Sequence, residues 1–317
     1  MNAPVSLLER ARTQFGDRPG TASANATILG PIRAELFSVE RLEQHADSLA
    51  QAQAVTADPQ RGRTLMARLR ENERMIAEAY RSIVKATHER RQISPAAEWL
   101  LDNYHVIDEQ IREIVDDLPS GYYRKLPKLA EGPLEGYPRV FGIAWALVAH
   151  SDSALDTDRL TRFVDTYQKR QLLTIGELWA IAITLRLTLV ENLRRLGEAI
   201  IERLSARRMA DELADRMFEP QSGAWSPAEL DGAPWSTAFA VQLAQRLRDH
   251  DPDATPALEW LNKRLAAEGT NTEAILRKEV QRQSETNVSV RNVITSMRLV
   301  STIIGLNGLK ASARLTA

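Results

Sequence analysis

Three features that this 317-residue sequence lacks restrict what the protein can be. It has no cysteine, which excludes disulfides, thiolate metal sites and cysteine nucleophiles and is consistent with a reducing cytoplasm. Its 41 Lys and Arg residues nearly balance 42 Asp and Glu residues, so no overall field favours nucleic acid as a partner. The N-terminus lacks the basic and apolar regions of a secretory signal. We therefore expect a cytoplasmic location.

Long hydrophobic runs are also absent. The longest near-continuous apolar stretch, residues 178–190, is interrupted by Arg186. A membrane-spanning helix needs about 20 apolar residues, and this run is shorter than that. The run therefore predicts a buried helix, and we expect no direct membrane span. A buried guanidinium requires a carboxylate or carbonyl partner, which makes Arg186 a candidate for a structural ion pair or for ligand binding.

Motifs of the common enzyme classes are missing as well. The sequence has no Gly-rich phosphate loop, no GxSxG, no HExxH and no Rossmann fingerprint. His105 and Glu109 are one helical turn apart, a spacing that allows two side chains to share a metal or a proton. No second motif completes a metal shell, and a solvated helix face is the simpler interpretation. We expect no catalytic residue, no cofactor and no metal site.

The hydrophobic pattern predicts an all-α fold of about ten helices, built from antiparallel helical hairpins in a multi-helix bundle or solenoid-like array. Residues 1–30 lack periodicity and predict a flexible N-terminal arm. Apolar residues at helical spacing from Ile32, and again from Leu65, predict a hairpin over 31–93. The first of these helices has an acidic excess and the second a basic one, so the hairpin would pair their charges.

Residues 94–205 are expected to form the core helical domain. Ser94-Pro95 predicts a helix start, followed by one continuous helix to about residue 118. Thr174-x-x-Glu177 is a capping box that opens a second helix, to about Leu204. Six apolar positions are expected to share one core: Leu100, Ile107, Ile111, Leu178, Leu185 and Leu189. Three tryptophans, Trp99, Trp145 and Trp179, are also expected to be buried by core packing.

Residues 206–317 predict a C-terminal helical region. Thr255-Pro256 indicates a helix start, and Thr270-x-x-Glu273 is a second capping box. The tail over 304–317 is atypical of this region.

Between the two core helices lies a connector over 119–139 that is rich in proline, glycine and tyrosine. Long ordered loops of this kind often have functional roles. Aromatic rings stack on sugars and basic groups hold hydroxyls or phosphates, which gives a set of candidate ligand-binding residues: Tyr122, Tyr123, Arg124, Tyr137, Arg139 and Arg186. The alternative, which we favour, is that the tyrosines anchor the loop to the helices through their rings and hydroxyls.

Three segments resemble, in their amino-acid sequence and in their order, the region ahead of the glycosyltransferase in bacterial cyclic β-1,2-glucan synthases. These segments read ISPAAEWLLDNYHVIDEQIREI, DDLPSGYYRKLPKLAEGPLEGYPRV and TIGELWAIAITLRLTLVENLRRL. The resemblance covers roughly residues 60 to 303. Members of that family are large inner-membrane enzymes, and their transferase and phosphorylase-like motifs have no counterpart in this sequence. After RNVITSMRLVST the sequence also departs from the pattern of the family, which suggests a truncated or frame-shifted relative.

The resemblance implies a non-catalytic cytoplasmic helical domain with a structural or regulatory role in glucan synthesis. The implied partners are the glycosyltransferase domain or membrane portion of a glucan synthase, and glucan or a sugar nucleotide is an implied ligand. Such a chain would lie at the cytoplasmic face of the inner membrane if it is part of the full-length assembly. Two alternatives stay open: a carbohydrate-active or glycan-binding all-α domain that uses the loop from Tyr122 to Arg139, and a generic helical protein-interaction scaffold.

Overall fold

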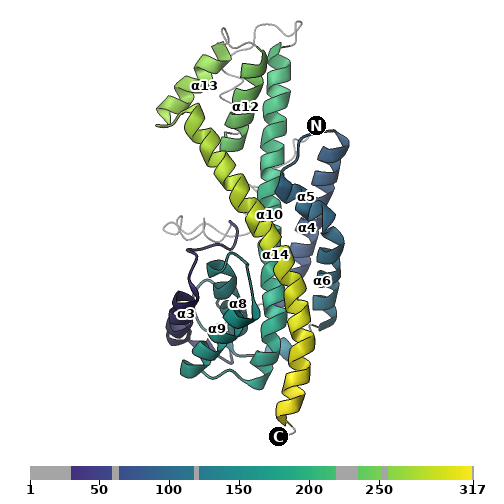
Figure 1. Ribbon diagram of the computed structural model, residues 1–317, viewed down its shortest axis with the longest axis vertical. Coiled ribbons are helices and arrows are strands. Elements are labelled where there is room, and N and C mark those ends of the chain that lie inside the picture. The colour runs from purple at the N-terminus through teal and green to yellow at the C-terminus, as the bar shows by residue number, and fades with distance from the viewer. Residues whose placement is uncertain (1–29, 59–63, 118–120, 219–234, 251–255, 316–317) are drawn as a thin grey trace.

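Eleven helices, joined by one two-stranded ribbon, make up the part of the chain that the computed structural model describes, which is residues 30–58, 64–117, 121–218, 235–250 and 256–315 (Figure 1). The all-α prediction is confirmed. The predicted arm lies outside the described residues except for Gly30. The elements are α3 (Val39–Ala52), β1 (Val55–Thr56), α4 (Leu65–His88), α5 (Pro95–Asp102), α6 (Tyr104–Asp117), α7 (Tyr122–Lys125), β2 (Lys128–Leu129), α8 (Arg139–His150), α9 (Thr157–Arg170), α10 (Ile175–Phe218), α12 (Thr237–His250), α13 (Pro256–Ala267) and α14 (Thr272–Leu315).

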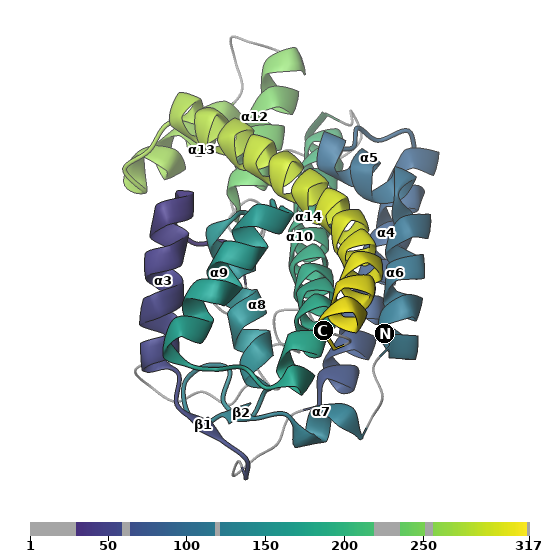
Figure 2. The ribbon, with the colours of Figure 1, turned by 60° about the horizontal axis from the view of Figure 1, so that its bottom comes forward.

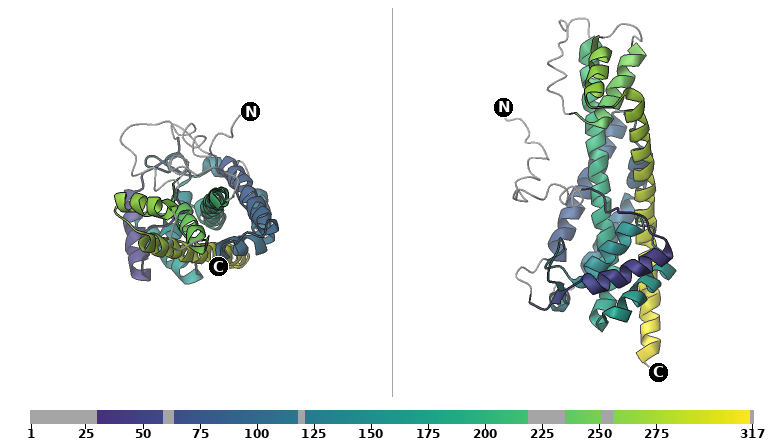
Figure 3. Two further views of the ribbon diagram at one scale, coloured as in Figure 1. Left: turned by 90° about the horizontal axis from the view of Figure 1, so that it is seen from above. Right: turned by 90° about the vertical axis from the view of Figure 1, so that its left-hand side faces the viewer.

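Helix α10 is the axis of the fold. It has 44 residues and contacts α4, α5, α6, α8, α12 and α14, so that in Figure 3 it is seen end-on with other helices around it. The capping box is confirmed, because the Glu177 amide donates to Thr174 Oγ1 (3.2 Å) and the Thr174 amide donates to Glu177 Oε2 (2.9 Å). The helix continues past the predicted end near Leu204, because its last turns pack in a second core.

Two hydrophobic cores lie along α10. The first joins α10 to α3–α9 and to the middle of α14, and it contains Leu100, Ile107, Ile111, Leu185 and Leu189, as the sequence predicts. The second joins the last part of α10 to α12, α13 and the start of α14. Its fully buried side chains include Leu243, Leu247 and Leu261.

The first predicted helix is shorter than expected. Ser38, whose hydroxyl accepts a hydrogen bond from the Arg41 amide, starts the helix at Val39, so Ile32 lies in a non-helical segment before it. Ile32 is nevertheless buried, because its backbone is bound to the Asn192 side chain on α10. The apolar side chain of Ile32 therefore indicates that the residue is buried, but not that it is helical.

The predicted hairpin over 31–93 does not form. Helix α3 packs against α9, and α4 packs against α10 on the other side of the molecule (Figure 2). The acidic residues of α3 do pair with basic ones, but these lie on α9: Glu43 binds Arg162 and Asp47 binds Arg170, each at 2.6 Å. The charge pattern predicted that α3 pairs with basic side chains, but it did not predict which helix supplies them.

The helix predicted to run continuously from Ser94 is broken at Asn103 into α5 and α6. The start is as expected, since Ser94 Oγ accepts from the Ala97 amide. At Asn103 the side-chain amide donates to the Trp99 carbonyl (2.8 Å), and Asn103 Oδ1 accepts from Arg298 on α14 (2.9 Å). An asparagine that binds the backbone of the preceding turn competes with helix continuation.

Helix α14 binds the buried connector between α8 and α9. Asp152 and Ser153 have φ values of +49° and +59°, an uncommon left-handed conformation for residues with side chains. Ser289 of α14 donates to Asp152 Oδ1 (2.7 Å) and Ser296 donates to the Ser153 carbonyl (2.6 Å). These contacts hold the strained turn. The start of α14 differs from the prediction, because Asn271 Oδ1, and not Thr270, accepts from the Ala274 amide at the N-cap.

Three apolar residues expected in the core are exposed. Leu178 is 40% exposed, Trp99 39% and Trp179 63%. Trp145 is only partly exposed and packs against the first core as expected. One face of the first turns of α10 is covered, since Glu177 and Ala180 are buried, and the other, with Leu178 and Trp179, is not. The helical period alone could not show which face would be covered.

Candidate functional site

Charged side chains are buried at three levels along α10, and these levels contain most of the candidate residues. Glu177 lies in the first turn, Arg186 in the fourth, and Glu191 with Arg195 in the next two. Each is at most 3% exposed. Burial of a charge is costly unless it is paired and hydrogen-bonded, so the partners of each group determine what it can do.

At the first level, Arg139 and Glu177 form a buried ion pair. Arg139 donates through Nε (2.8 Å) and Nη2 (2.6 Å) to the two oxygens of Glu177, and its Nη1 donates to Gln171 Oε1 (2.8 Å). Burial alone would raise the pKa of Glu177, but the hydrogen bonds from Arg139 and Thr174 lower it below its ordinary value. Arg139, a predicted ligand-binding residue, is therefore saturated by internal partners.

The tyrosines of the connector point into the fold. Tyr122 donates from its hydroxyl to the Gly176 carbonyl at the start of α10. Tyr123 is 8% exposed and its burial raises the pKa of its hydroxyl. Tyr137 is buried and accepts a hydrogen bond from Arg68 Nη1 (3.1 Å). This arrangement is the anchoring role that the sequence left as the alternative to sugar stacking.

The basic residues of the connector do not share one cavity. Lys128 is buried, donates to the carbonyls of Tyr123 (2.8 Å) and Arg124 (3.1 Å), and has its pKa lowered by burial. Arg124 and Lys125 are exposed on α7 instead. A shallow hollow that the structure does show lies elsewhere, on α14, and is lined by Leu276, Arg277, Val280, Gln281, Ser284 and Glu285.

At the second level, Arg186 has the acidic partners that its position in an apolar helix requires. It donates to Glu113 Oε2 (2.9 Å) and Asp117 Oδ2 (2.6 Å), both on α6. The side chain of Arg186 is 2% exposed, whereas those of its two partners are more than 40% exposed. The pair thus joins α10 to the solvent-facing edge of α6, which is a structural role.

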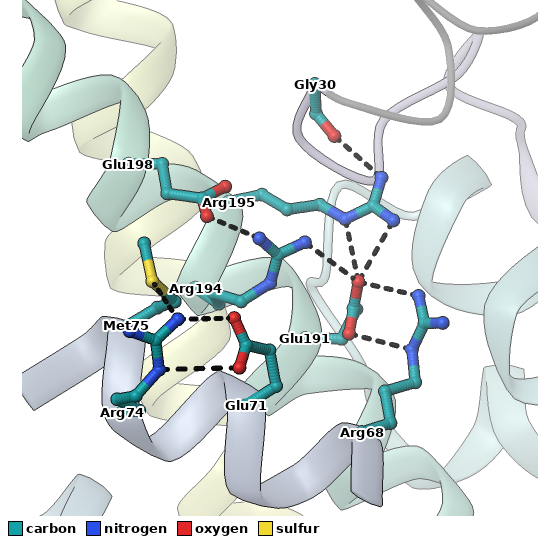
Figure 4. Close-up of polar contacts among 9 residues, drawn as sticks. All are labelled: Gly30, Arg68, Glu71, Arg74, Met75, Glu191, Arg194, Arg195 and Glu198. Carbon is teal, nitrogen blue, oxygen red and sulfur yellow. Dashed lines mark hydrogen bonds and ion pairs between the residues drawn. The ribbon is translucent and has the colours of Figure 1, made fainter. Parts of the chain in front are cut away.

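The third level is a network around Glu191 (Figure 4). Arg68 of α4 binds both carboxylate oxygens, at 2.8 and 2.7 Å, while Arg195 binds Oε1 at 3.0 Å and Arg194 at 3.2 Å. Burial would raise the pKa of Glu191, but the three guanidinium groups lower it to about 2. Glu191 is therefore an anion at neutral pH.

The same network holds the first described residues of the chain. Arg195 Nη1 donates to the Gly30 carbonyl (2.9 Å), as Figure 4 shows. The guanidinium of Arg68 also lies over the rings of Tyr137, Phe141 and Trp145, within 5.7 Å of each centroid. The network thus joins α4, α8, α10 and the N-terminal segment.

The buried carboxylates of the site are occupied by internal partners. Each buried carboxylate described above is bound by at least one guanidinium, so it is neither a free base nor a proton donor near neutral pH. Within the described ranges, no group of three or more potential metal ligands gathers. His105 and Glu109 are both exposed on α6, the solvated face that the sequence favoured. In the same part of the chain, no helix is long and apolar enough to cross a membrane.

Comparison with known proteins finds a similar segment in a much longer protein. Over 270 residues the chain is 35% identical to the cyclic beta-(1,2)-glucan synthase NdvB of Rhizobium meliloti (strain 1021). The chain is homologous to a segment of that protein. The match covers 84% of this chain and 10% of NdvB, so the chain spans about a tenth of the length of this relative. No protein-family model matches the chain.

Sequence reasoning missed two features of the site. The Glu191 network was not found, because charge clusters such as ENLRR over residues 191–195 normally lie on a solvated helix face. A signal was present, since these charges directly follow the most apolar stretch of α10. The exposed apolar side chains at the start of α10 were also missed, since the helical period assigns them to the core.

Proposed function

We propose that this chain forms a non-catalytic helical module of a glucan synthase-like protein, with a structural or regulatory role in cyclic β-1,2-glucan synthesis. The observation that carries the proposal is the 35% identity with NdvB over 84% of the chain. The module would act at the cytoplasmic face of the inner membrane, and its partner would be the transferase domain or the membrane portion of such a synthase.

The internal pairing of the buried charges supports a non-catalytic role. Arg139 with Glu177, Arg186 with Glu113, and Glu191 with Arg68 all connect one helix to another. A protein built in this way presents a rigid set of helices, among them the 44-residue α10 and α14, against which another domain can pack. Such a module would position catalytic domains and would not itself transfer glucose.

The first experiment tests the isolated chain. Purified protein incubated with UDP-glucose and Mg²⁺ or Mn²⁺ is expected to release no UDP and form no β-1,2-glucan above a protein-free control. Membranes that contain NdvB serve as the positive control. Glucan formation by the purified chain would contradict the proposal.

The second experiment tests the role itself. The NdvB segment that matches this chain is deleted, and the deleted segment is then replaced by the matching 270 residues of this chain. We expect deletion to reduce glucan yield and the graft to restore it. Unchanged yield and ring size after deletion, with normal amounts of protein in the membrane, would refute a structural or regulatory role.

A further inference from the structure

The start of α10 presents large apolar side chains to solvent. Leu172 in the preceding loop is 81% exposed, Ile175 74% and Trp179 63%. Leu178, at 40%, extends the same surface. These four residues, called here the α10 tip, are within seven positions of each other, and large apolar side chains gathered on a surface mark interaction sites.

Basic side chains surround the α10 tip. Helix α7 is attached there, because Tyr122 binds the Gly176 carbonyl and a Cβ on Gly176 would lie 3.3 Å from the Tyr122 hydroxyl. Figure 2 shows α7 at this end of the molecule. The last two residues of α7, Arg124 and Lys125, are exposed. The last turn of α9, just before Leu172, adds the exposed Lys169.

The acid nearest to the α10 tip in sequence is removed from the surface. Glu177 lies between Ile175 and Trp179 but is fully buried and bound by Arg139. Arg170, also in the last turn of α9, is neutralised by Asp47 on α3. Arg124, Lys125 and Lys169 are exposed basic side chains beside the apolar residues of the tip.

The position of the tip also matters. In Figure 1 the start of α10 lies at the lower end of the elongated molecule, and the C-terminal end of α14 extends past it in the same direction. The tip thus lies at an end of the molecule and not on its flank.

We propose that the α10 tip docks on an anionic lipid surface. The tip is formed by a loop and a first helical turn at the end of the molecule, a projecting shape that can enter a fluid interface without a complementary groove. Tryptophan is enriched at the membrane–water boundary, where its ring is apolar and its N–H stays hydrated. Basic side chains beside it are attracted to anionic headgroups. This inference does not depend on the proposed role in glucan synthesis.

Vesicle flotation tests the proposal with the full chain. We expect the protein to float with vesicles of phosphatidylcholine and phosphatidylglycerol and to stay unbound with phosphatidylcholine alone. A variant with Leu172, Ile175 and Trp179 each changed to Ser is expected to lose at least tenfold in affinity. The matched control changes Leu276, Val280 and Val288 to Ser, since these are also exposed apolar residues but lie on α14, and it should bind as the unchanged protein does.

A second variant tests the basic residues without touching the apolar ones. Arg124, Lys125 and Lys169 are each changed to Gln. Each charge near an anionic surface contributes about fivefold in affinity, so the loss should be on the order of 100-fold at low salt and should shrink as salt is added. Because all three side chains are exposed, the fold should be retained, which far-UV circular dichroism would verify.

Depth of insertion is measured by fluorescence. Lipids brominated in their acyl chains are expected to quench part of the tryptophan emission in the unchanged protein, and Trp179→Phe should remove that part while keeping the binding. Equal binding of the unchanged protein, the tip variant and the basic variant would overturn the proposal. So would a dimer in light scattering that the tip variant disperses while vesicles bind neither protein, because the tip would then contact a second copy.

Discussion

Replacement of Glu191 by Gln is the sharpest test of how the fold is held together. The substitution keeps the size of the side chain and removes the charge that faces Arg68, Arg194 and Arg195. The Arg195 side chain is only 2% exposed, so it cannot turn to solvent for compensation. Removing one partner from a buried ion pair leaves the other charges uncompensated, which costs about 3–5 kcal/mol.

The pKa of Glu191 gives a second way to obtain the free energy by which its charge stabilises the folded state. A folded pKa of about 2 against an ordinary value of 4.5 corresponds to roughly 3 kcal/mol in favour of the folded state at neutral pH. Because the folded pKa is the lower one, this stabilisation is fully present above about pH 4.5 and is lost as the pH falls toward 2. The two routes agree within their precision.

Urea unfolding, followed by far-UV circular dichroism, measures the effect. Glu71→Gln is the matched control, because Glu71 also binds an arginine, Arg74, at 2.7 Å, but both side chains are more than half exposed. We expect a loss of roughly 3 kcal/mol for Glu191→Gln at pH 7 and less than about 1 kcal/mol for the control. The loss should shrink between pH 4.5 and pH 2. Equal losses for the two variants, or a loss that does not change with pH, would refute the reasoning.

Three further predictions concern the core, the connector and a cap. Leu185→Ala should cost about 2–5 kcal/mol because Leu185 is fully buried, and Leu178→Ala should cost much less; similar shifts in thermal melting would contradict this. Tyr123→Phe removes a buried hydroxyl that has no hydrogen-bond partner among the described residues, so stability should stay equal or rise and calorimetry should detect no change in binding of linear β-1,2-glucan. Asn271→Ala should cost about 1 kcal/mol and Thr270→Ala less, as urea midpoints would show; a larger loss for Thr270 would place the cap there instead.

Sequence reasoning worked where a local interaction determines the structure. The capping box at Thr174 and Glu177 and the N-cap at Ser94 formed as predicted, because both need only neighbouring residues. Helical spacing likewise placed Leu100, Ile107 and Leu185 in the core. The acidic partners of Arg186 followed from the cost of burying a guanidinium in an apolar helix.

Sequence reasoning failed where two distant segments decide the outcome. The division between α5 and α6 depends on Asn103, which binds both the turn before it and Arg298 on α14. Helix α3 pairs with α9 because Arg162 and Arg170 lie opposite its acids, and nothing local distinguishes these arginines from those of α4. For the same reason, the sequence could not show that Glu191 binds Arg68 of α4 in the interior and does not belong to an ordinary surface cluster of charges.

The sequence by itself determined that the protein is helical, that helices begin after Ser94 and Thr174, and which helix faces are apolar, since these depend on residues a few positions apart. Only the tertiary structure decided which helices meet, and with them the fate of each polar side chain. The tyrosines of the connector became anchors because Gly176 and Arg68 lie within reach of their hydroxyls. Trp179 became a surface residue because its own face of α10 is left uncovered, whereas Glu177 and Ala180 in the same turns are buried. Burial is a property of the whole assembly, and a helical period shows only that a face is available to be buried.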